Sequence, residues 1–494
     1  MSVYDLAVIG GGVNGCGIAR DAAGRGLSVH LCDKGDLGGG ASSASTKLVH
    51  GGLRYLERFE LRMVREALAE RETLMRIAPH IVRPMRFVLP RVAGSRPWPI
   101  LKLGLFVYDH LGGRRTLRRS SAIRLAADEA GAPLRSAEGR AFEYSDCWVD
   151  DARLVVLNAL DAAERGATIA PRTACVAARR SGGAWTVTLE GPQGRSEIRA
   201  RGLVNAAGPW VTEVAHGAIG ANGIKQTRLV RGSHIVTARL FEHDRAYLLQ
   251  QSDGRVVFAI PFEDDFTLIG TTDVDHAGAA DDAFATEAEI DYLCAAASEA
   301  FKWEVGQEDV LWSFAGVRAL HDDGSGAAQA ASRDYALDLE AGDGRAPMLT
   351  VYGGKITTYR RLAEAALEKL AQVMAIPKGR WTGRSALPGG GFHGDVPLAD
   401  RLTAAFPFLT DAIAARFARS YGSRAWDMLE GARDASSLGR FFGADLTERE
   451  VRYLIAKEWA FTAEDVLWRR TKLGLRFDDA ERAALADYMP GGEA

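Results

Sequence analysis

The sequence predicts a mixed α/β and α+β fold with three parts: a discontinuous α/β domain, an antiparallel-sheet domain inserted into it, and an all-helical C-terminal domain. Two short apolar runs, Tyr4–Ile9 and Leu27–Cys32, flank a stretch with helical spacing at 14–25, which is the pattern of a βαβ unit. From about residue 226 to 335, apolar runs alternate with acidic or glycine-containing turns, as in antiparallel hairpins. Beyond about residue 386 the apolar residues keep helical spacing.

Later segments repeat the βαβ pattern and set the expected domain boundaries. The helical stretch Ala152–Arg165 and the apolar runs Gly202–Ala207 and Met348–Tyr352 belong with the first unit. We therefore expect a Rossmann-like domain made of residues 1–80, 145–225 and 335–385, a sheet domain made of 81–144 and 226–334, and a helical domain at 386–494.

The composition excludes several classes of protein. The chain has 494 residues, which is too long for one simple core. Its 61 Lys and Arg nearly balance 64 Asp and Glu, so it lacks the basic excess of a nucleic-acid binder. The five cysteines are scattered and never form a C-x-x-C pair, which indicates a reduced, intracellular protein without a structural zinc site or a disulfide framework. No stretch approaches 18 apolar residues, so we expect no membrane-spanning helix.

A glycine-rich turn after the first predicted strand indicates a dinucleotide site. The spacing G-x-G-x-x-G is carried by Gly10, Gly12 and Gly15, and it stands between a strand and a helix. Bare backbone there can approach a pyrophosphate, and the positive end of the helix favours its charge. Asp33, at the end of the second strand, is placed to accept hydrogen bonds from a ribose hydroxyl. An empty glycine turn is the alternative, and the combination with Asp33 argues against it.

A second glycine-rich turn bears on which dinucleotide is bound. Gly353, Gly354 and Lys355 form a late strand-to-helix turn. Such a helix start could stabilise the anionic reduced form of a flavin ring, which favours FAD over NAD. Taken alone, the same turn is more often an ordinary connection between a strand and a helix.

Seven segments of the chain closely resemble the FAD-dependent glycerol-3-phosphate dehydrogenases. They are Gly38–Glu57, Glu143–Arg153, Gly202–Trp210, Gly232–Val236, Ile269–Asp273, Gly353–Tyr359 and Asp465–Gly474. The likeness covers nearly the whole chain and is greatest to the respiratory, aerobic-type bacterial enzymes of the D-amino-acid-oxidase-like flavoprotein superfamily.

The resemblance implies FAD as the cofactor and sn-glycerol 3-phosphate as the substrate, oxidised to dihydroxyacetone phosphate with electrons passed to a membrane quinone. It further implies a homodimer bound peripherally to the inner leaflet of the cytoplasmic membrane. Three alternatives stay open: a glycerol-3-phosphate oxidase that uses O₂, an amine or amino-acid oxidase of the same fold, and a flavin-binding protein without activity.

The resemblance also implies a set of site residues. Those expected around the substrate are Arg54, Tyr55, Thr272, Arg318 and Arg333, together with His234 and Lys355. Those expected at the cofactor, besides the glycine turns and Asp33, are Ser43, Ser45 and Gly208. Arginine suits a phosphate dianion because its planar fork binds two oxygens at once.

The catalytic base is left open between two side chains. His234 is the first candidate, since an unperturbed imidazole titrates close to neutral pH. Lys355 is the second, as a base of lowered pKa or as a cation near a developing alkoxide. Arg318 is the third residue expected at the reaction centre, and it stands in Gly316–Leu320, where alanine replaces a proline frequent in the family. We expect this change to loosen the turn after Arg318.

One segment, residues 97–117, is a candidate for membrane contact. It is rich in apolar residues, ends in a cluster of arginines, and is too short and too charged to span a bilayer. It could lie in the interface, with its apolar side in the acyl boundary. A buried core helix explains the pattern equally well; the resemblance favours the membrane and makes Leu105 and Phe106 the expected anchors.

Overall fold

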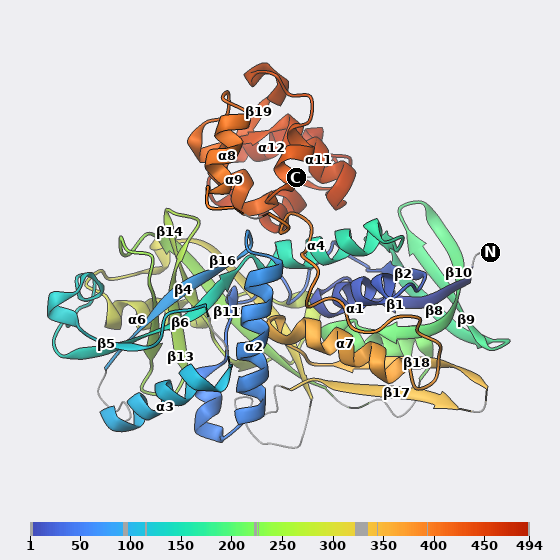
Figure 1. Ribbon diagram of the computed structural model, residues 1–494, viewed down its shortest axis with the longest axis horizontal. Helices are drawn as coiled ribbons and strands as arrows, with labels where there is room; N and C mark the ends of the chain where they lie inside the picture. The colour runs from blue at the N-terminus through green and yellow to red at the C-terminus, as the bar shows by residue number, and fades with distance from the viewer. Residues whose placement is uncertain are drawn as a thin grey trace.

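The computed structural model describes residues 3–91, 97–113, 116–221, 225, 227–321, 334–342, 344–392 and 394–492, excluding the side chains of Arg54, Glu57, Arg58 and His321. Two sheet domains lie side by side, and a helical domain sits above their junction (Figure 1). This organisation confirms the predicted fold class.

The first domain is built on a sheet with the strand order β17-β18-β10-β1-β2-β7, extended by β8 and β9. Strand β1 (Val3–Ile9) pairs in parallel with β2 (Val29–Cys32) and with β10 (Gly194–Asn205). The other strands are β7 (Thr168–Ala170), β8 (Ala174–Ser181), β9 (Ala184–Gly191), β17 (Ala336–Gly342) and β18 (Arg345–Tyr352). Its strands thus come from three distant parts of the chain, as a discontinuous domain requires.

Three helices with apolar faces cover this sheet and form the largest core with it. Helix α1 (Val13–Gly24) packs against α4 (Asp151–Glu164) and α7 (Tyr359–Leu370). Small residues allow the close approach, because a Cβ at Gly17 would lie 2.8 Å from the Tyr359 ring. The packing holds α1, and with it the glycine turn at its start, at the edge of the sheet.

The second domain is built on a mostly antiparallel sheet with the order β15-β11-β14-β13-β12-β4-β6-β3, in which β16 also pairs with β11 and β5 with β6. Its strands are β3 (Leu48–Val49), β4 (Val82–Pro90), β5 (Ser121–Arg124), β6 (Arg140–Val149), β11 (Thr227–Ala238), β12 (Ala246–Gln250), β13 (Val256–Phe262), β14 (Phe266–Gly270), β15 (Val274–Asp275) and β16 (Val310–His321). Helix α6 (Glu287–Ala300) packs on one face, while α2 (Leu61–Ile77) and α3 (Trp98–Leu111) pack on the other. The predicted hairpin region is therefore confirmed.

Two of the expected boundaries between these domains need correction. The sequence pattern places residues 145–149 in the first domain, but they continue β6 and pair with β4. Strand β3 lies within the expected segment 1–80, yet it pairs with β6 in the second sheet. The apolar pattern could not reveal this, because a buried strand has the same pattern whichever sheet provides its partners.

The C-terminal domain has its own apolar core. Its helices are α8 (Leu398–Ala405), α9 (Asp411–Tyr421), α10 (Arg424–Leu429), α11 (Glu448–Glu458) and α12 (Asp479–Tyr488), and a short hairpin of β19 (Phe441–Gly443) and β20 (Leu446–Thr447) joins two of them. Thr462 and Asp465 form a reciprocal cap: the Thr462 amide donates to the Asp465 carboxylate at 3.0 Å, and the Asp465 amide donates to the Thr462 hydroxyl at 3.3 Å.

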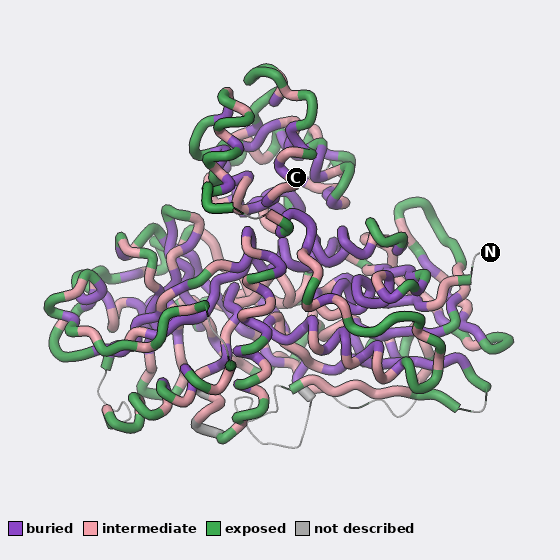
Figure 2. Tube along the Cα trace, viewed as in Figure 1, coloured by how far each residue is buried: buried purple, intermediate pink, exposed green. Residues whose placement is uncertain are grey.

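Helix α3 is half embedded and half exposed. Leu105 is 2% exposed and points into the core, whereas Ile100, Leu103 and Phe106 are 55%, 62% and 58% exposed. Figure 2 shows the exposed side of this helix on the lower edge of the molecule. The expectation that Leu105 is an anchor is wrong, because the helical period turns it inward. Within the described part of the chain, no helix is long and apolar enough to cross a membrane.

Candidate functional site

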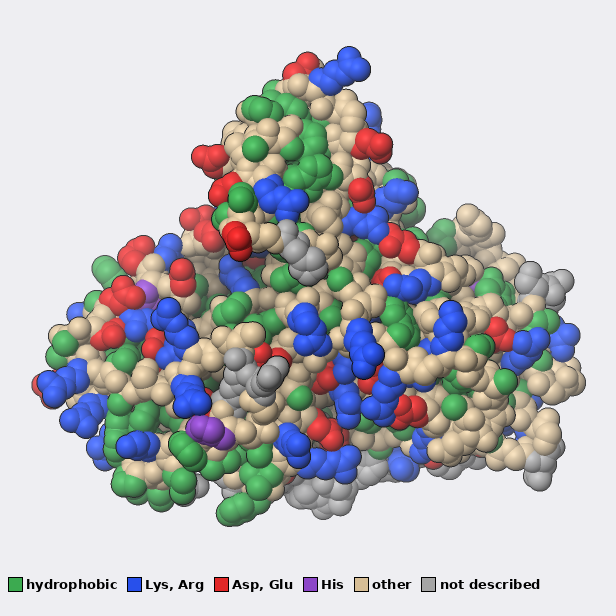
Figure 3. Space-filling model, viewed as in Figure 1, with side chains coloured by type: hydrophobic (Ala, Val, Ile, Leu, Met, Phe, Trp, Pro, Cys, Tyr) green, Lys and Arg blue, Asp and Glu red, His purple; other side chains and the backbone are tan. Residues whose placement is uncertain are grey.

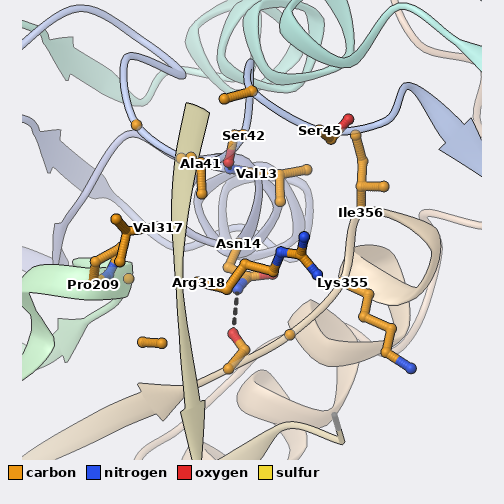
Figure 4. A pocket seen from close by; sticks show the side chains of 18 of the residues that line it. Val13, Asn14, Ala41, Ser42, Ser45, Pro209, Val317, Arg318, Lys355 and Ile356 are labelled. Atoms are coloured by element: carbon orange, nitrogen blue, oxygen red, sulfur yellow. Dashed lines mark hydrogen bonds between the residues drawn. The ribbon is translucent and has the colours of Figure 1, made fainter. Parts of the chain in front are cut away.

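A cavity of about 760 Å³ opens where the carboxyl ends of the parallel strands meet the second sheet. Figure 4 shows the start of α1, the loop that holds Ser42 and Ser45, and the side chains of Arg318 and Lys355 around it. The expected site residues that line it are Gly10, Gly12, Asp33, Ser45, Gly208, Gly353, Gly354, Lys355, Tyr55, His234 and Arg318. Both sheet domains therefore contribute to one site, as open α/β folds favour at strand ends.

The first glycine turn brings bare backbone to the wall of the cavity. Gly10 has a φ of 112°, and a Cβ there would lie 2.4 Å from the carbonyl oxygen of Ala206. Gly12 is the N-cap of α1 and lines the cavity, while the amide of Val13 donates to the Ser42 hydroxyl at 3.0 Å. Gly15 does not line the cavity; a Cβ there would lie 1.8 Å from the Gly10 carbonyl oxygen, so its role is packing.

Asp33 ties this turn to the end of β2. Its carboxylate accepts from the amide of Gly11 at 2.6 Å and from the amide of Gly35 at 2.7 Å. Burial raises the pKa of Asp33, although both amide hydrogen bonds favour the charged form. Each carboxylate oxygen has a second lone pair, which a ribose hydroxyl can use.

The second glycine turn touches the first. Gly353 and Gly354 have φ values of 68° and 102°, and the Asn14 side chain donates to the Gly353 carbonyl at 3.1 Å. This hydrogen bond is drawn in Figure 4. Next in sequence, the Lys355 ammonium lies 4.1 Å from the centre of the Tyr55 ring. The contact holds a cation and a phenol on the same wall of the cavity.

Arg318 reaches the cavity from β16. One of its guanidinium nitrogens is 3.3 Å from the Asp273 carboxylate. The expected loosening after Arg318 is wrong, because there is no turn: residues 316–320 pair with β11 without a shift in register. Alanine at position 319 has the backbone N–H that a proline would lack, so the strand continues.

His234 is at the wall but is deeply buried. It is 1% exposed, its ring stacks on Phe314 at 4.9 Å, and its Nε2 is 2.9 Å from the Thr46 hydroxyl. Burial and the nearby cations Lys47 and Arg318 lower its pKa well below 6.5. His234 is therefore a neutral imidazole at physiological pH.

Some expected site residues lie away from the cavity. Thr272 is 0% exposed; its hydroxyl donates to Glu289 at 2.7 Å and accepts from the Ser233 amide at 2.9 Å. Its neighbour Thr271 lines the cavity instead. Ser43 does not line the cavity either, and its carbonyl accepts from the buried ammonium of Lys47. Sequence alone does not decide which of two adjacent residues points inward.

Two predicted arginines cannot be placed. Arg333 lies outside the described residues. Arg54 belongs to a short 3-10 helix, η1 (Leu53–Arg58), but its side chain lies outside what the structure describes. Their roles stay predictions.

His50 is a lining residue that the sequence analysis missed. It is half-buried, its amide donates to the Thr357 hydroxyl at 3.3 Å, and its ring lies edge-on to Phe258 at 6.4 Å. A signal was present, since His50 directly precedes the glycine pair Gly51–Gly52 in a segment that carries the resemblance.

Comparison with protein families now decides the kind of site. Residues 5–360 match the family described as FAD dependent oxidoreductase. The chain belongs to this family. In this FAD-dependent oxidoreductase, residues 380–489 also match the C-terminal domain of alpha-glycerophosphate oxidase.

Curated relatives and a solved structure agree with the assignment to the FAD-dependent oxidoreductases. The chain is 51% identical to a D-erythritol 1-phosphate dehydrogenase of Brucella abortus, over 98% of this chain and 97% of the relative. It is 50% identical to a glycerol-3-phosphate dehydrogenase of Pseudomonas aeruginosa, over 99% and 95% of the two chains. A structure of the glycerol-3-phosphate dehydrogenase from Bacillus halodurans complexed with FAD superposes with a TM-score of 0.73, at 27% identity over 95% and 86% of the two chains.

The cofactor is FAD, and the residues present fit it. A methyl group at Gly10 would collide with the backbone, so glycine is needed there for the turn to pack closely beside the cofactor cavity. The start of α1 presents amides to a pyrophosphate. Asp33 can bind the ribose, and the cavity runs on to Lys355 and Arg318.

Proposed function

We propose that the protein oxidises sn-glycerol 3-phosphate to dihydroxyacetone phosphate. The observation that carries the proposal is the pair of cationic side chains, Arg318 and Lys355, in the same cavity as the glycine turn that fits FAD. A dianionic phosphate needs such cations in a fixed arrangement. The 50% identity to a glycerol-3-phosphate dehydrogenase over nearly the whole chain supports this substrate.

Oxidation of the secondary alcohol at C2 removes two electrons and two protons. FAD, when bound, accepts both electrons and one proton, and the protein must take the other proton from the hydroxyl group. Arg318, oriented by Asp273, and Lys355 are proposed to hold the phosphate and to stabilise negative charge that develops on the C2 oxygen. Arg54 and Arg333 are predicted to join them.

Exposure distinguishes the candidate proton acceptors. His234 lines the cavity but is only 1% exposed, and its Nδ1 is buried without a hydrogen-bond partner among the described residues, so little of its ring is open to a substrate. His50 is half-buried and lines the same cavity. We therefore propose His50 as the base, and His234 as a neutral side chain that shapes the wall.

This assignment predicts different results for two histidine variants. His50→Asn should lower kcat by about 10²- to 10⁴-fold, the usual contribution of a general base. His234→Asn should keep the shape of the kcat/KM profile between pH 6.5 and 9, because the lowered pKa leaves His234 neutral throughout that range. Steady-state kinetics across pH measures both. A His234→Asn profile that loses a limb in this range would contradict the assignment.

A second candidate substrate is D-erythritol 1-phosphate, favoured by the relative that is 51% identical. Anaerobic titration of the holoenzyme with each polyol phosphate, followed by flavin absorbance, separates the two. Bleaching by glycerol 3-phosphate at lower concentration, and recovery on addition of a soluble quinone, is the expected result. Preference for the four-carbon substrate would replace the first proposal, and a flavin that neither reduces would overturn both.

We also propose that the electrons pass to a membrane quinone and that α3 contacts the inner leaflet of the cytoplasmic membrane. Hydrophobic side chains gather on the lower edge of the molecule (Figure 3), where Figure 1 places α3. The exposed face of α3 consists of Ile100, Leu103 and Phe106, with Lys102 beside them. Interfacial helices bind membranes through such a face.

Replacing Ile100, Leu103 and Phe106 together with serine should release the protein from anionic lipid vesicles without lowering its melting temperature, since all three are exposed. Co-sedimentation with vesicles measures the release. The matched control is Phe284→Ser with Trp303→Ser, which removes exposed apolar side chains from the segments just before and just after α6. Helix α6 packs on the face of the sheet opposite to α3. Equal release by both variants, or by neither, would argue against α3 as the anchor.

A further inference from the structure

A chain of four rings in contact connects the C-terminal domain to the wall of the cavity. Trp468 lies in a π-helical turn, η10 (Asp465–Arg470), and stacks on Trp312 of β16 with ring centres 4.3 Å apart and planes 22° apart. Trp312 contacts Phe314 at 4.5 Å, and Phe314 stacks on His234. Trp468 packs against the core of the C-terminal domain and Trp312 against that of the second sheet domain, so the stack bridges two cores.

The same face of β16 carries Arg318. Side chains two residues apart on a strand share a face, so Trp312, Phe314 and Arg318 point the same way. Between them, Gly316 is pressed against the FAD-binding domain, since a Cβ there would lie 2.9 Å from the Cβ of Ala44. The indole of Trp468 therefore supports the strand that delivers Arg318 to the cavity.

The next two residues of the turn contact the cofactor side of the cavity. Arg470 is 0% exposed and forms a two-pronged ion pair with Asp36, at 2.7 and 2.8 Å. Arg469 adds a third hydrogen bond to Asp36 at 2.6 Å, and it also lines the cavity. Asp36 lines the cavity as well, in the loop that begins at the ribose-binding Asp33.

Local contacts hold this turn in one shape. Lys472 has a φ of 64° and its ammonium donates to the Trp468 carbonyl at 2.6 Å. Gly474 lies against the Trp468 indole, where a Cβ would come within 2.7 Å of the ring. π-helical turns are rare and occur frequently at functional sites.

Other contacts attach the C-terminal domain without reaching the cavity. Arg153 of α4 pairs with Glu458 of α11, and Arg476 pairs with Asp265 between β13 and β14. None of these four residues lines the cavity. The C-terminal domain is therefore attached by contacts other than those that Trp468 and Arg470 make with β16 and Asp36.

We propose that residues 465–472, here called the brace, position both walls of the active site: Trp468 fixes β16 and its Arg318, and Arg470 fixes the ribose-binding loop through Asp36. The proposal gives the C-terminal domain a catalytic purpose and explains the segment Asp465–Gly474, which carries part of the resemblance. The effect on turnover rests on the proposed polyol phosphate oxidation; the effects on β16 and on FAD binding do not.

The proposed role of Trp468 is tested by comparing Trp468→Ala with the control variant Trp426→Ala in the full-length holoenzyme. Trp426 is also half-buried and packs on Phe406, but within the C-terminal domain alone. Trp468→Ala should lower kcat/KM by about 10- to 100-fold, as small misplacements of binding groups do, and should speed hydrogen exchange of β16 amides. Trp426→Ala should change neither, and Trp468→Phe should restore most of both.

A double-mutant cycle with Arg318→Met tests whether Trp468 affects turnover through Arg318. If Trp468 acts through Arg318, adding Trp468→Ala to Arg318→Met should cost less than twofold in kcat/KM. Additive losses would overturn the route. Unchanged β16 exchange in Trp468→Ala would overturn the brace itself, whereas a parent enzyme that turns over no polyol phosphate would overturn only the proposed function.

The proposed role of Arg470 is tested by measuring how tightly the apoprotein binds FAD. Arg470→Lys keeps the charge but loses the planar fork, and it should raise the Kd of the apoprotein for FAD about tenfold, which corresponds to the loss of roughly one charge-assisted hydrogen bond. Arg476→Met breaks an interdomain ion pair elsewhere and should leave this Kd unchanged. Equal Kd values for Arg470→Lys and the parent, from fluorescence titration, would overturn this role.

Discussion

Replacing Gly12 with alanine should yield a folded protein that binds FAD about 10- to 100-fold more weakly, the loss that one misplaced methyl group causes in a close-packed site. A Cβ at Gly12 meets only the Ser42 hydroxyl, at 3.2 Å, and the backbone φ of −78° suits alanine. The fold should therefore tolerate the change. The added methyl group projects into the cavity where the start of α1 faces the pyrophosphate.

Two other glycine variants make the result specific. Gly104→Ala, in α3, has nothing within 4 Å of the new Cβ and should leave FAD binding unchanged. Gly10→Ala should fail to fold normally, because its positive φ and the Ala206 carbonyl at 2.4 Å leave no room. Titration of each apoprotein with FAD, together with circular dichroism, separates the outcomes. A Gly12→Ala protein with the parental Kd would remove this turn from the cofactor site.

Replacing Arg318 with methionine should lower kcat/KM for glycerol 3-phosphate by about 30-fold or more, since loss of one partner of a charged hydrogen-bonded pair costs about 2–5 kcal/mol. Most of the loss should appear in KM if Arg318 binds the phosphate, and in kcat if it stabilises charge at C2. Arg318→Lys should recover only part, because lysine cannot offer two parallel donors.

Chemical reduction distinguishes a binding defect from a damaged flavin site. Arg318→Met should retain stoichiometric FAD that dithionite reduces as in the parent, while substrate reduces it slowly. The control is Arg180→Met, which removes an arginine that pairs with Glu340 near the surface of the first domain. An Arg318→Met enzyme with parental kcat/KM would exclude Arg318 from the substrate site.

Much of the cofactor site could be predicted from local sequence. The two glycine turns are each defined by a few adjacent residues whose backbone geometry follows from the absence of a Cβ. Asp33 was predictable because an acidic residue follows the second strand of the βαβ unit at the usual spacing. Because each of these features directly follows a predicted strand, its place at the end of that strand could be predicted. The reciprocal cap of Thr462 and Asp465 was predictable as well, because its two side chains stand three residues apart in the chain.

The substrate side was less predictable because it depends on side-chain direction. Thr271 and Thr272 are adjacent, and only the pairing of β11 with its neighbours turns Thr271 toward the cavity. His234 and His50 both line the cavity, yet their burial differs in a way that no spacing indicates. The inward turn of Leu105 on α3 likewise follows from which face packs on the sheet.

The sequence by itself determined the three-part fold, the dinucleotide turn and its acidic partner, because each has a local pattern: the periodicity of strands and helices, the spacing of the glycines, and an acidic residue at a strand end. The tertiary structure alone decided the sheet to which residues 145–149 belong, the contact between the two glycine turns, and the meeting of Trp468 with Trp312. Each of these contacts joins residues far apart in the chain, and their geometry is set by how separate cores pack together.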